Sequence, residues 1–588
     1  MRPRVLSYPA ADVAGETRCV RYRALDFAVG TAPEAGPLNW SQQVMWALIE
    51  AMSPVTESLN VRLGLRLRAD VTEDEVFDGL RDLVQTHEAL RSLYVTLPQG
   101  PGQQVLDAGR IEVAIVECSD ADADEQAAMS VMEDLAAVPF DIAEEWPTRV
   151  AVVCVGGQPR HLVFALCHLS VDALGVMAIK DHLRPLLRSE RVDVSSPRVA
   201  YQMLREAEWE RSPAGLRCAA RAVSQHERTL SRMPQTMLPR HVEEIGPPRY
   251  RYLEFESSAL AVAVSALAAG HNTTPATVLF AGVAAVSGFV SGLPEAFLQV
   301  TVANRTEPRL RGAVGMYIQE VPVCVDLADA SIADVIARSG QAILPAARFG
   351  RYPPADMLAA RRRVELRRGA AFDLSCWINY SPNVRLAPVA DRPSPRALAQ
   401  ARSRTRWRWI DGPDSSTSSY FIFVTEGPDT LVLTVVLDTA LLHPPEAVGW
   451  LRAVEQVLCA SLDGDVAVSQ LDRHAELTAT SRSGDWCLTD AGWACLPDVV
   501  DLVRGVSGAP RAEVFAVPSA EGPCLTAFLD GGRLVPDIGE LHTACVDALP
   551  GNRTVIAPQH YVVCAGAPRV SDLTGWQRLP VSAEGTGR

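Results

Sequence analysis

The sequence has 588 residues, of which 48% are hydrophobic and 21% charged, and its formal net charge is −15. This length predicts two or more domains, and the composition is typical of an ordered globular protein. The acidic balance argues against a nucleic-acid partner. Lys180 is the only lysine, so arginine carries nearly all of the positive charge.

The thirteen cysteines are scattered, without a Cys-x-x-Cys pair or another zinc-ligand spacing. This distribution predicts reduced, mostly buried thiols, no metal site and a cytoplasmic protein. Charged side chains interrupt residues 1–25 before any apolar segment of signal-peptide length. The most apolar stretch, residues 276–293, is rich in alanine and glycine, and we expect a buried helix there rather than a membrane span.

Predicted helices and strands alternate along the first half of the chain. Residues 1–36 are expected to form an N-terminal extension. Residues 39–52 and 73–87 carry apolar side chains at helical spacing, whereas the alternation at residues 59–67 is typical of a half-buried strand. Further strands are expected at residues 113–116, 149–155 and 162–167, followed by a helix at residues 172–183.

The same alternation recurs after residues 188–245, a polar segment with several prolines that we place at the junction of two lobes. The mixture of elements predicts an α/β fold. A linker at residues 464–482 leads to a small α/β module at the end of the chain. Helices are expected at residues 259–269, 275–287, 332–344 and 445–461, strands at 296–302, 321–325 and 376–379, and a hairpin at 420–425 and 430–437.

One segment, residues 164–173 (FALCHLSVDA), carries a candidate catalytic pair. His168 lies at the exit of a predicted buried strand, and Asp172 lies at the start of the next helix. Rigid elements would hold such a histidine while it faces a cleft at the strand end. An aspartate at a helix start can cap the helix or pair with an arginine. The spacing alone is also compatible with a structural histidine.

The segment resembles the His-His-x-x-x-Asp-Gly motif of the condensation domains of nonribosomal peptide synthetases, within the chloramphenicol-acetyltransferase-like acyltransferases. Other segments are similar to further signatures of that family and follow in the same order, so that the resemblance covers roughly residues 38–475. They are residues 38–48 (LNWSQQVMWAL), 83–92 (LVQTHEALRS), 139–142 (PFDI), 303–305 (ANR), 314–323 (VGMYIQEVPV), 373–375 (DLS) and 378–380 (INY).

The resemblance implies two chloramphenicol-acetyltransferase-like lobes in a V shape. The N-terminal lobe would comprise residues 37–215 and the C-terminal lobe residues 216–475, followed by a module at residues 483–588. A tunnel between the lobes would receive an acyl or peptidyl group on the phosphopantetheine of a carrier protein, and an amine or aminoacyl acceptor. The product would be an amide, or an ester where the acceptor is a hydroxyl. No bound cofactor, metal, nucleic acid or membrane is implied.

The resemblance also implies roles for individual residues. His168 corresponds to the catalytic histidine, which would orient or deprotonate the nucleophile. Asp172 would be structural, with Arg305 as its partner. Asn379 would donate a hydrogen bond at the reaction centre.

Four positions depart from the family pattern. Cys167 replaces the first histidine, Ala173 replaces the glycine, and Gln319-Glu320 replaces the usual Asn-Thr. We expect Cys167 to be an inert buried thiol. Successive residues leaving a strand point to opposite faces, so Cys167 and His168 cannot easily form a pair of nucleophile and base. Ala173 adds a methyl group where the donor arm would pass, and a charge at Glu320 would reshape the tunnel. The departures leave a second hypothesis open, a catalytically silent platform that recruits a carrier protein or a tailoring enzyme.

Residues 541–563 resemble the C-terminal subdomain of adenylate-forming domains. In that family a lysine near the end contacts the acyl phosphate, but residues 483–588 contain no lysine. Arginine does not readily replace the compact charge of lysine. We therefore expect no ATP-dependent activation, and we interpret the segment as a degenerate module that docks on a partner or braces the second lobe.

Overall fold

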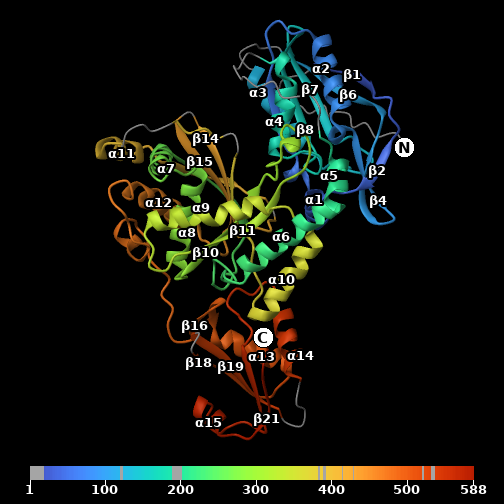
Figure 1. The fold of residues 1–588 in the computed structure, drawn as a ribbon. Coiled ribbons are helices and arrows are strands. Elements are labelled where there is room, and N and C mark those ends of the chain that lie inside the picture. The colour runs from blue at the N-terminus through green and yellow to red at the C-terminus, as the bar shows by residue number, and fades with distance from the viewer. Residues whose placement is uncertain are drawn as a thin grey trace. The chain divides into compact units, whose positions relative to one another are not determined.

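The structure, a computed structural model, describes residues 19–118, 124–187, 201–381, 384–387, 393–413, 415–427, 429–519, 522–531 and 537–587. The chain forms two compact units, whose elements are labelled in Figure 1. Unit 1 comprises the residues up to 221 with 303–319 and 351–354, and unit 2 comprises 222–302, 320–350 and 355–588. Each unit combines helices with β-sheets, so the predicted α/β class is confirmed.

Unit 1 is built on a five-stranded sheet in the order β1-β6-β7-β8-β3. Its two faces are buried in different apolar clusters: Val113 and Phe164 pack with α2, whereas their neighbours Ala114 and Ala165 pack with α3. Period-two alternation along each strand produces these two faces. The elements are β1 Cys19–Ala28, β3 Val61–Arg66, β6 Ala108–Cys118, β7 Thr148–Val155, β8 Gln158–Leu166, α1 Trp40–Met52, α2 Glu73–Thr86, α3 Asp124–Ala136, α4 Ala173–His182, α5 Met203–Arg211 and the smaller sheet β2 Glu34–Pro37, β5 Gly100–Val105 and β4 Ser92–Leu97.

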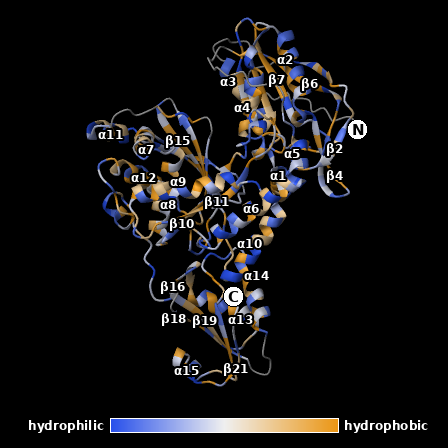
Figure 2. Ribbon diagram, viewed as in Figure 1, coloured by the Kyte–Doolittle hydropathy of each residue, from blue (hydrophilic) through white to orange (hydrophobic). Residues whose placement is uncertain are grey.

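Unit 2 contains a seven-stranded mixed sheet in the order β11-β10-β12-β14-β15-β9-β13. Strands β10, β12 and β14 are parallel, and the predicted hairpin is confirmed by the antiparallel pair β14 and β15. Hydrophobic residues gather on strands such as β15 here and β7 in unit 1 (Figure 2). The elements are β9 Tyr250–Ser257, β10 Glu295–Val302, β11 Gln319–Asp326, β12 Cys376–Tyr380, β13 Arg406–Asp411, β14 Tyr420–Gly427, β15 Thr430–Asp438, α7 Ser258–Gly270, α8 Pro275–Ser291, α9 Ile332–Arg348, α10 Pro354–Arg368, α11 Pro395–Arg402 and α12 Pro444–Ala460.

The apolar helix expected after residue 275 is α8, and most of its residues are buried within unit 2. It contacts the helices α7, α9 and α12 and the strand β10. In the described part of the chain, no helix taken singly has both the length and the apolar character of a membrane span. Helices α7 and α8 meet those criteria only together, as a pair bent by 110°.

The end of the chain belongs to unit 2 and packs against the rest of that unit. Its apolar core includes Ala370 and Ala371, which precede β12. The Ala557 backbone N–H donates to the carbonyl of Gly369 at 2.7 Å. These contacts support the bracing interpretation over a separate docking module. The elements are β16 Trp486–Thr489, β17 Gly492–Cys495, α13 Leu496–Ser507, β18 Ala512–Ser519, β19 Gly522–Asp530, α14 Ile538–Asp547, β20 His560–Cys564, α15 Leu573–Gln577 and β21 Val581–Thr586.

The division into units does not follow the predicted lobe boundaries. The boundary after residue 221 falls inside α6 Pro213–Leu230, close to the predicted residue 215. Residues 303–319 and 351–354, however, belong to unit 1, although the sequence places them in the second lobe. One physical reason is that Arg305 Nη1 donates to Asp172 Oδ2 at 2.7 Å, which joins the first segment to unit 1. Gln319 joins the second segment to the first, because it donates to the Tyr352 carbonyl at 2.9 Å and accepts from the Tyr352 N–H at 3.2 Å.

Candidate active site

His168 lies in the turn between β8 and α4, where the sequence predicts it. The backbone closes this turn on itself, because Ser170 N and Val171 N both donate to the Cys167 carbonyl, at 2.9 and 3.2 Å. Cys167 N in turn donates to the Pro147 carbonyl at 3.0 Å. The histidine is therefore presented by a short turn anchored to the sheet.

Asp172 is fully buried and is the N-cap residue of α4. Its Oδ1 atom accepts from Gly175 N at 2.8 Å. Its Oδ2 atom accepts from Arg305 Nη1 at 2.7 Å and from Tyr317 N at 2.9 Å. Three donors on a buried carboxylate fix its position, so Asp172 links the turn to the start of α4, to Arg305 and to the backbone at Tyr317.

The Arg305 guanidinium fastens a second segment of unit 1 to the same turn. Its Nη2 atom donates to the carbonyls of Ala313 and Gly315, at 3.3 and 3.2 Å. The Gly315 carbonyl also accepts from Asp172 N at 3.1 Å. The guanidinium carbon lies 4.8 Å from the ring centroid of Tyr317, where a cation is favoured.

Side chains near the start of the chain hold the other side of the histidine turn. The Leu169 carbonyl accepts from Tyr94 Oη at 3.2 Å and from Gln42 Nε2 at 3.4 Å. Gln42 also completes a capping box with Asn39 at the start of α1. Asn39 Nδ2 donates to the Met316 carbonyl at 3.1 Å. The sequence offers Asn39 or Ser41 as the cap of this helix, and Asn39 is the cap in the structure. The sequence gives Gln42 no role beyond the signature, and it gives none to Tyr94.

His168 is half-buried, and burial lowers the pKa of its imidazole. The backbone groups of His168 and Val171 and the Asp172 carboxylate act weakly in the opposite direction. Among the described residues, no group meets hydrogen-bond geometry with its buried Nδ1 atom. The ring is therefore neutral at neutral pH, the state in which a histidine can accept a proton.

The two residues that depart from the family motif differ in environment. Cys167 is 4% exposed and packs in the main apolar core of unit 1. Burial raises the pKa of its thiol to about 12, so the thiol is protonated and unreactive. Ala173 is exposed, so its methyl group does not press into that core.

The remaining predicted positions lie at β11 and β12. The Gln319 side chain is engaged by Tyr352, which gives it a structural role in unit 1. Burial raises the pKa of Glu320 to about 7, so this carboxyl group titrates near neutral pH instead of carrying a fixed charge. Asn379 lies half-buried on β12 of unit 2, opposite Phe423 of β14. Its role at a reaction centre stays a prediction.

The chain also matches a known protein family. Residues 34–380 match the model of the condensation domain. The isonitrile lipopeptide synthase of Mycobacterium tuberculosis is 26% identical over 333 residues, which cover 54% of this chain and 13% of that protein. The chain spans a quarter or less of the length of the first curated relatives that it matches.

Two solved structures share the fold at low sequence identity. The first condensation domain of the calcium-dependent antibiotic synthetase aligns with a TM-score of 0.53 at 15% identity, over 76% of this chain and 99% of that one. The X-domain of teicoplanin biosynthesis, solved in complex with OxyB, aligns with a TM-score of 0.53 at 16% identity, over 76% and 98% of the two chains.

Proposed function

Because the chain belongs to the condensation-domain family, we propose that it is an acyltransferase of nonribosomal peptide biosynthesis. It transfers an acyl group from the phosphopantetheine thioester of a carrier protein to an amine, and forms an amide. With a hydroxyl acceptor, the product is an ester. One observation carries the proposal: a neutral, half-buried His168 on a turn that buried hydrogen bonds hold in place.

In the proposed reaction, the acceptor nitrogen attacks the thioester carbonyl carbon while the His168 imidazole takes a proton from that nitrogen. The carbon–sulfur bond then breaks, and the departing thiolate takes the proton from the imidazolium. The products are one amide and one free pantetheine thiol. Asn379 is proposed to donate a hydrogen bond to the negatively charged oxygen that develops during the attack.

Asp172 acts as a positioning residue in this proposal. Both of its oxygens accept hydrogen bonds from Gly175, Arg305 and Tyr317, and its side chain is fully buried. Such a carboxylate has no need to exchange a proton with substrate in order to keep the turn in place. We therefore place the proton transfer on His168 alone.

A basic groove in unit 2 supports a carrier protein as the partner. The groove has a volume of about 790 Å³, and four arginines and two carboxylates line it. An excess of guanidinium groups on a protein with a net charge of −15 gives an acidic partner a favourable site. The charged groups in the lining are Arg228, Arg232, Arg338, Arg367, Glu227 and Asp326.

The second candidate function is a catalytically silent platform that binds a carrier protein or a tailoring enzyme. The buried thiol at position 167, where the family motif has a histidine, favours it. The X-domain, which shares the fold, was solved as a complex with OxyB. A platform needs a binding surface but no proton acceptor, so it would tolerate loss of the His168 ring.

The deciding experiment incubates the protein with acyl-loaded carrier proteins and candidate amines, and follows both carrier and product by intact mass. The acyltransferase proposal expects loss of the acyl group from the carrier and appearance of the amide. Both should depend on His168. Tight binding of a carrier without any turnover, unaffected by His168→Ala, would favour the platform.

A further inference from the structure

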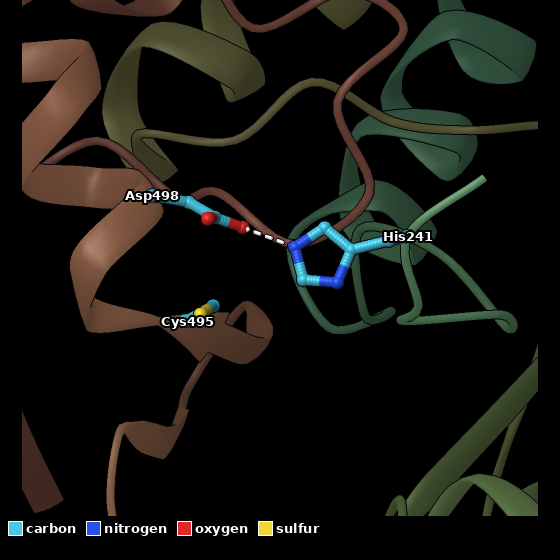
Figure 3. A group of neighbouring side chains, drawn as sticks. All are labelled: His241, Cys495 and Asp498. Carbon is cyan, nitrogen blue, oxygen red and sulfur yellow. Dashed lines mark hydrogen bonds and ion pairs between the residues drawn. The ribbon is translucent and has the colours of Figure 1, made fainter. Parts of the chain in front are cut away.

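We propose that His241, Cys495 and Asp498 form a zinc-binding site that ties the end of the chain to the rest of unit 2. Among the described residues, this is the one group of three side chains of ligand type whose donor atoms all lie within 4.8 Å of one another. Figure 3 shows the imidazole, the carboxylate and the thiol gathered around a common space. The sequence predicted no metal site, because residue 241 is remote from the other two.

The local fold brings the two later ligands to one end of a helix. Cys495 is the N-cap residue of α13, and Asp498 lies in its first turn. Thr554 positions both of them, because its carbonyl accepts from Cys495 N at 2.7 Å and its hydroxyl donates to the Asp498 carboxylate. A buried residue that orients two candidate ligands is the kind of support that metal sites use.

His241 comes from the segment that precedes β9, on the other side of the site. Its Nε2 atom lies 2.8 Å from Asp498 Oδ2, and its side chain is 63% exposed. Its ring also lies edge-on to Trp486, with centroids 6.1 Å apart. An exposed imidazole can shift by a few tenths of an ångström without disturbing a packed core.

The donor set and the spacing suit zinc. Thiolate, imidazole and carboxylate are its usual protein ligands, and water commonly takes a fourth position. Tetrahedral coordination at Zn–N and Zn–O distances of about 2.0–2.2 Å places these two ligand atoms about 3.4 Å apart. The His241–Asp498 separation must therefore widen slightly from its hydrogen-bonded value. All three ligand atoms lie within 4.8 Å of one another, so the Cys495 sulfur also needs only a small shift to coordinate the same ion.

Binding is coupled to proton release. A cysteine thiol has an ordinary pKa of about 8.5 and is largely protonated at neutral pH. Zinc binds the thiolate, and the displaced proton goes to solvent. The start of α13 favours the negative charge, because helix N-termini stabilise anions. One thiol proton is thus expected to leave for each ion bound.

The test uses the full chain after chelator treatment and buffer exchange. Titration with Co²⁺ is expected to give a thiolate-to-cobalt charge-transfer band and the intense visible bands of a four-coordinate ion, at one equivalent per chain. Zinc should displace the cobalt, and zinc should also raise the melting temperature. The variants are His241→Ala, Cys495→Ser and Asp498→Asn, with Cys487→Ser as the matched control, because Cys487 is a buried thiol on the neighbouring β16.

Each ligand variant should bind zinc at least about tenfold more weakly, and Cys495→Ser should lose the charge-transfer band and the coupled proton release. Cys487→Ser should behave as the wild type. Thr554→Val, which keeps the shape but removes the hydroxyl, should weaken binding without abolishing it. The proposal is overturned if cobalt binds well below one equivalent, or if the charge-transfer band survives in a folded Cys495→Ser protein.

Discussion

Asp172 and Arg305 are 133 positions apart in the sequence, yet their side chains meet at 2.7 Å between Oδ2 and Nη1. The Asp172 side chain is fully buried and that of Arg305 is 6% exposed. A buried pair of this kind adds little stability relative to apolar residues, but removal of one partner leaves an uncompensated charge. The pair thus makes the histidine turn depend on residues 303–319.

Asp172→Ala should therefore lower the stability of the fold as well as the activity. Loss of one partner from a buried pair costs about 3–5 kcal/mol, so a clearly lower melting temperature is expected together with lower turnover. Asp181→Ala, which removes an exposed carboxylate at the end of α4, is the control. An unchanged melting curve for Asp172→Ala would contradict the structural role.

His168→Ala should act on the reaction alone. Loss of a general base lowers turnover by about a hundredfold or more, whereas a half-buried side chain on a turn contributes little to the core. Thermal unfolding should therefore stay near that of the wild type, as it should in the exposed control His474→Ala. A folded His168→Ala protein with nearly full activity would rule out the catalytic role.

The pH dependence provides an independent check on His168. Burial lowers its pKa from the ordinary value of 6.5, so the neutral ring persists through pH 7 and below. The value of kcat/KM should not change with pH around pH 7, and it should fall only at pH values below 6.5. This acid limb should be absent from the residual activity of His168→Ala. A limb centred above pH 7 would contradict the assignment.

Cys167→Ala should retain most of the activity. The thiol is buried and its pKa is raised to about 12, so it offers no nucleophile at working pH. Alanine leaves a small cavity in the core, and a modest drop in melting temperature is the expected cost. An acyl adduct mapped to Cys167, with complete loss of turnover in the variant, would instead indicate a covalent intermediate.

The end of the chain should matter for stability and not for ATP chemistry. Arg553 forms an ion pair with Asp373 and donates to Ser419 Oγ at 2.8 Å, so Arg553→Met should lower the melting temperature. Truncation before residue 481 exposes Ala370 and Ala371 and should produce aggregated protein. ATP should neither change the melting temperature nor support pyrophosphate exchange. A truncated protein with a normal melting curve would contradict the bracing role.

A buried carboxyl group in unit 1 should make stability depend on pH above 4.5. Burial raises the pKa of Glu210 well above 4.5, and its Oε2 atom accepts from Trp40 N at 2.8 Å. The folded state therefore holds a proton that the unfolded state releases, so this contribution is complete below pH 4.5 and is lost as the pH rises through the folded pKa. Glu210→Gln, which keeps the acceptor, should show a smaller fall in melting temperature as the pH rises above 4.5, while the exposed Glu208→Gln should not.

Local patterns in the sequence predicted the elements whose apolar side chains face a core. Helix α2 is an example, because Val76, Leu80 and Leu83 recur at helical spacing and all are buried. Helix α10 was missed, since five of its last eight residues are arginines, and Glu365 and Arg368 are among its few buried residues. Charged side chains that are buried through ion pairs and contacts with carbonyl groups form no apolar stripe, so the sequence shows no helical pattern there.

The candidate site shows the same limit. The family motif located His168, Asp172 and Arg305, but a motif cannot reveal that the Tyr317 backbone N–H completes the Asp172 carboxylate. Every residue except proline has the same backbone N–H, so a sequence motif cannot show which of these groups donates a hydrogen bond at the site. The grouping of His241 with Cys495 and Asp498 was equally hidden, because it depends on how the end of the chain packs against the rest of unit 2.

The seven-stranded sheet of unit 2 has β13 at one edge, and we expect the charges on this strand to disfavour pairing with the edge of another molecule. A free edge offers unpaired backbone groups to the strands of other molecules. On β13, Arg406 and Arg408 reach across to Glu256 and Glu254 of β9 and remain largely exposed themselves. An approaching copy would have to place its own arginines beside these charges. Because like charges placed side by side destabilise strand pairing, we expect two β13 edges not to join into one sheet.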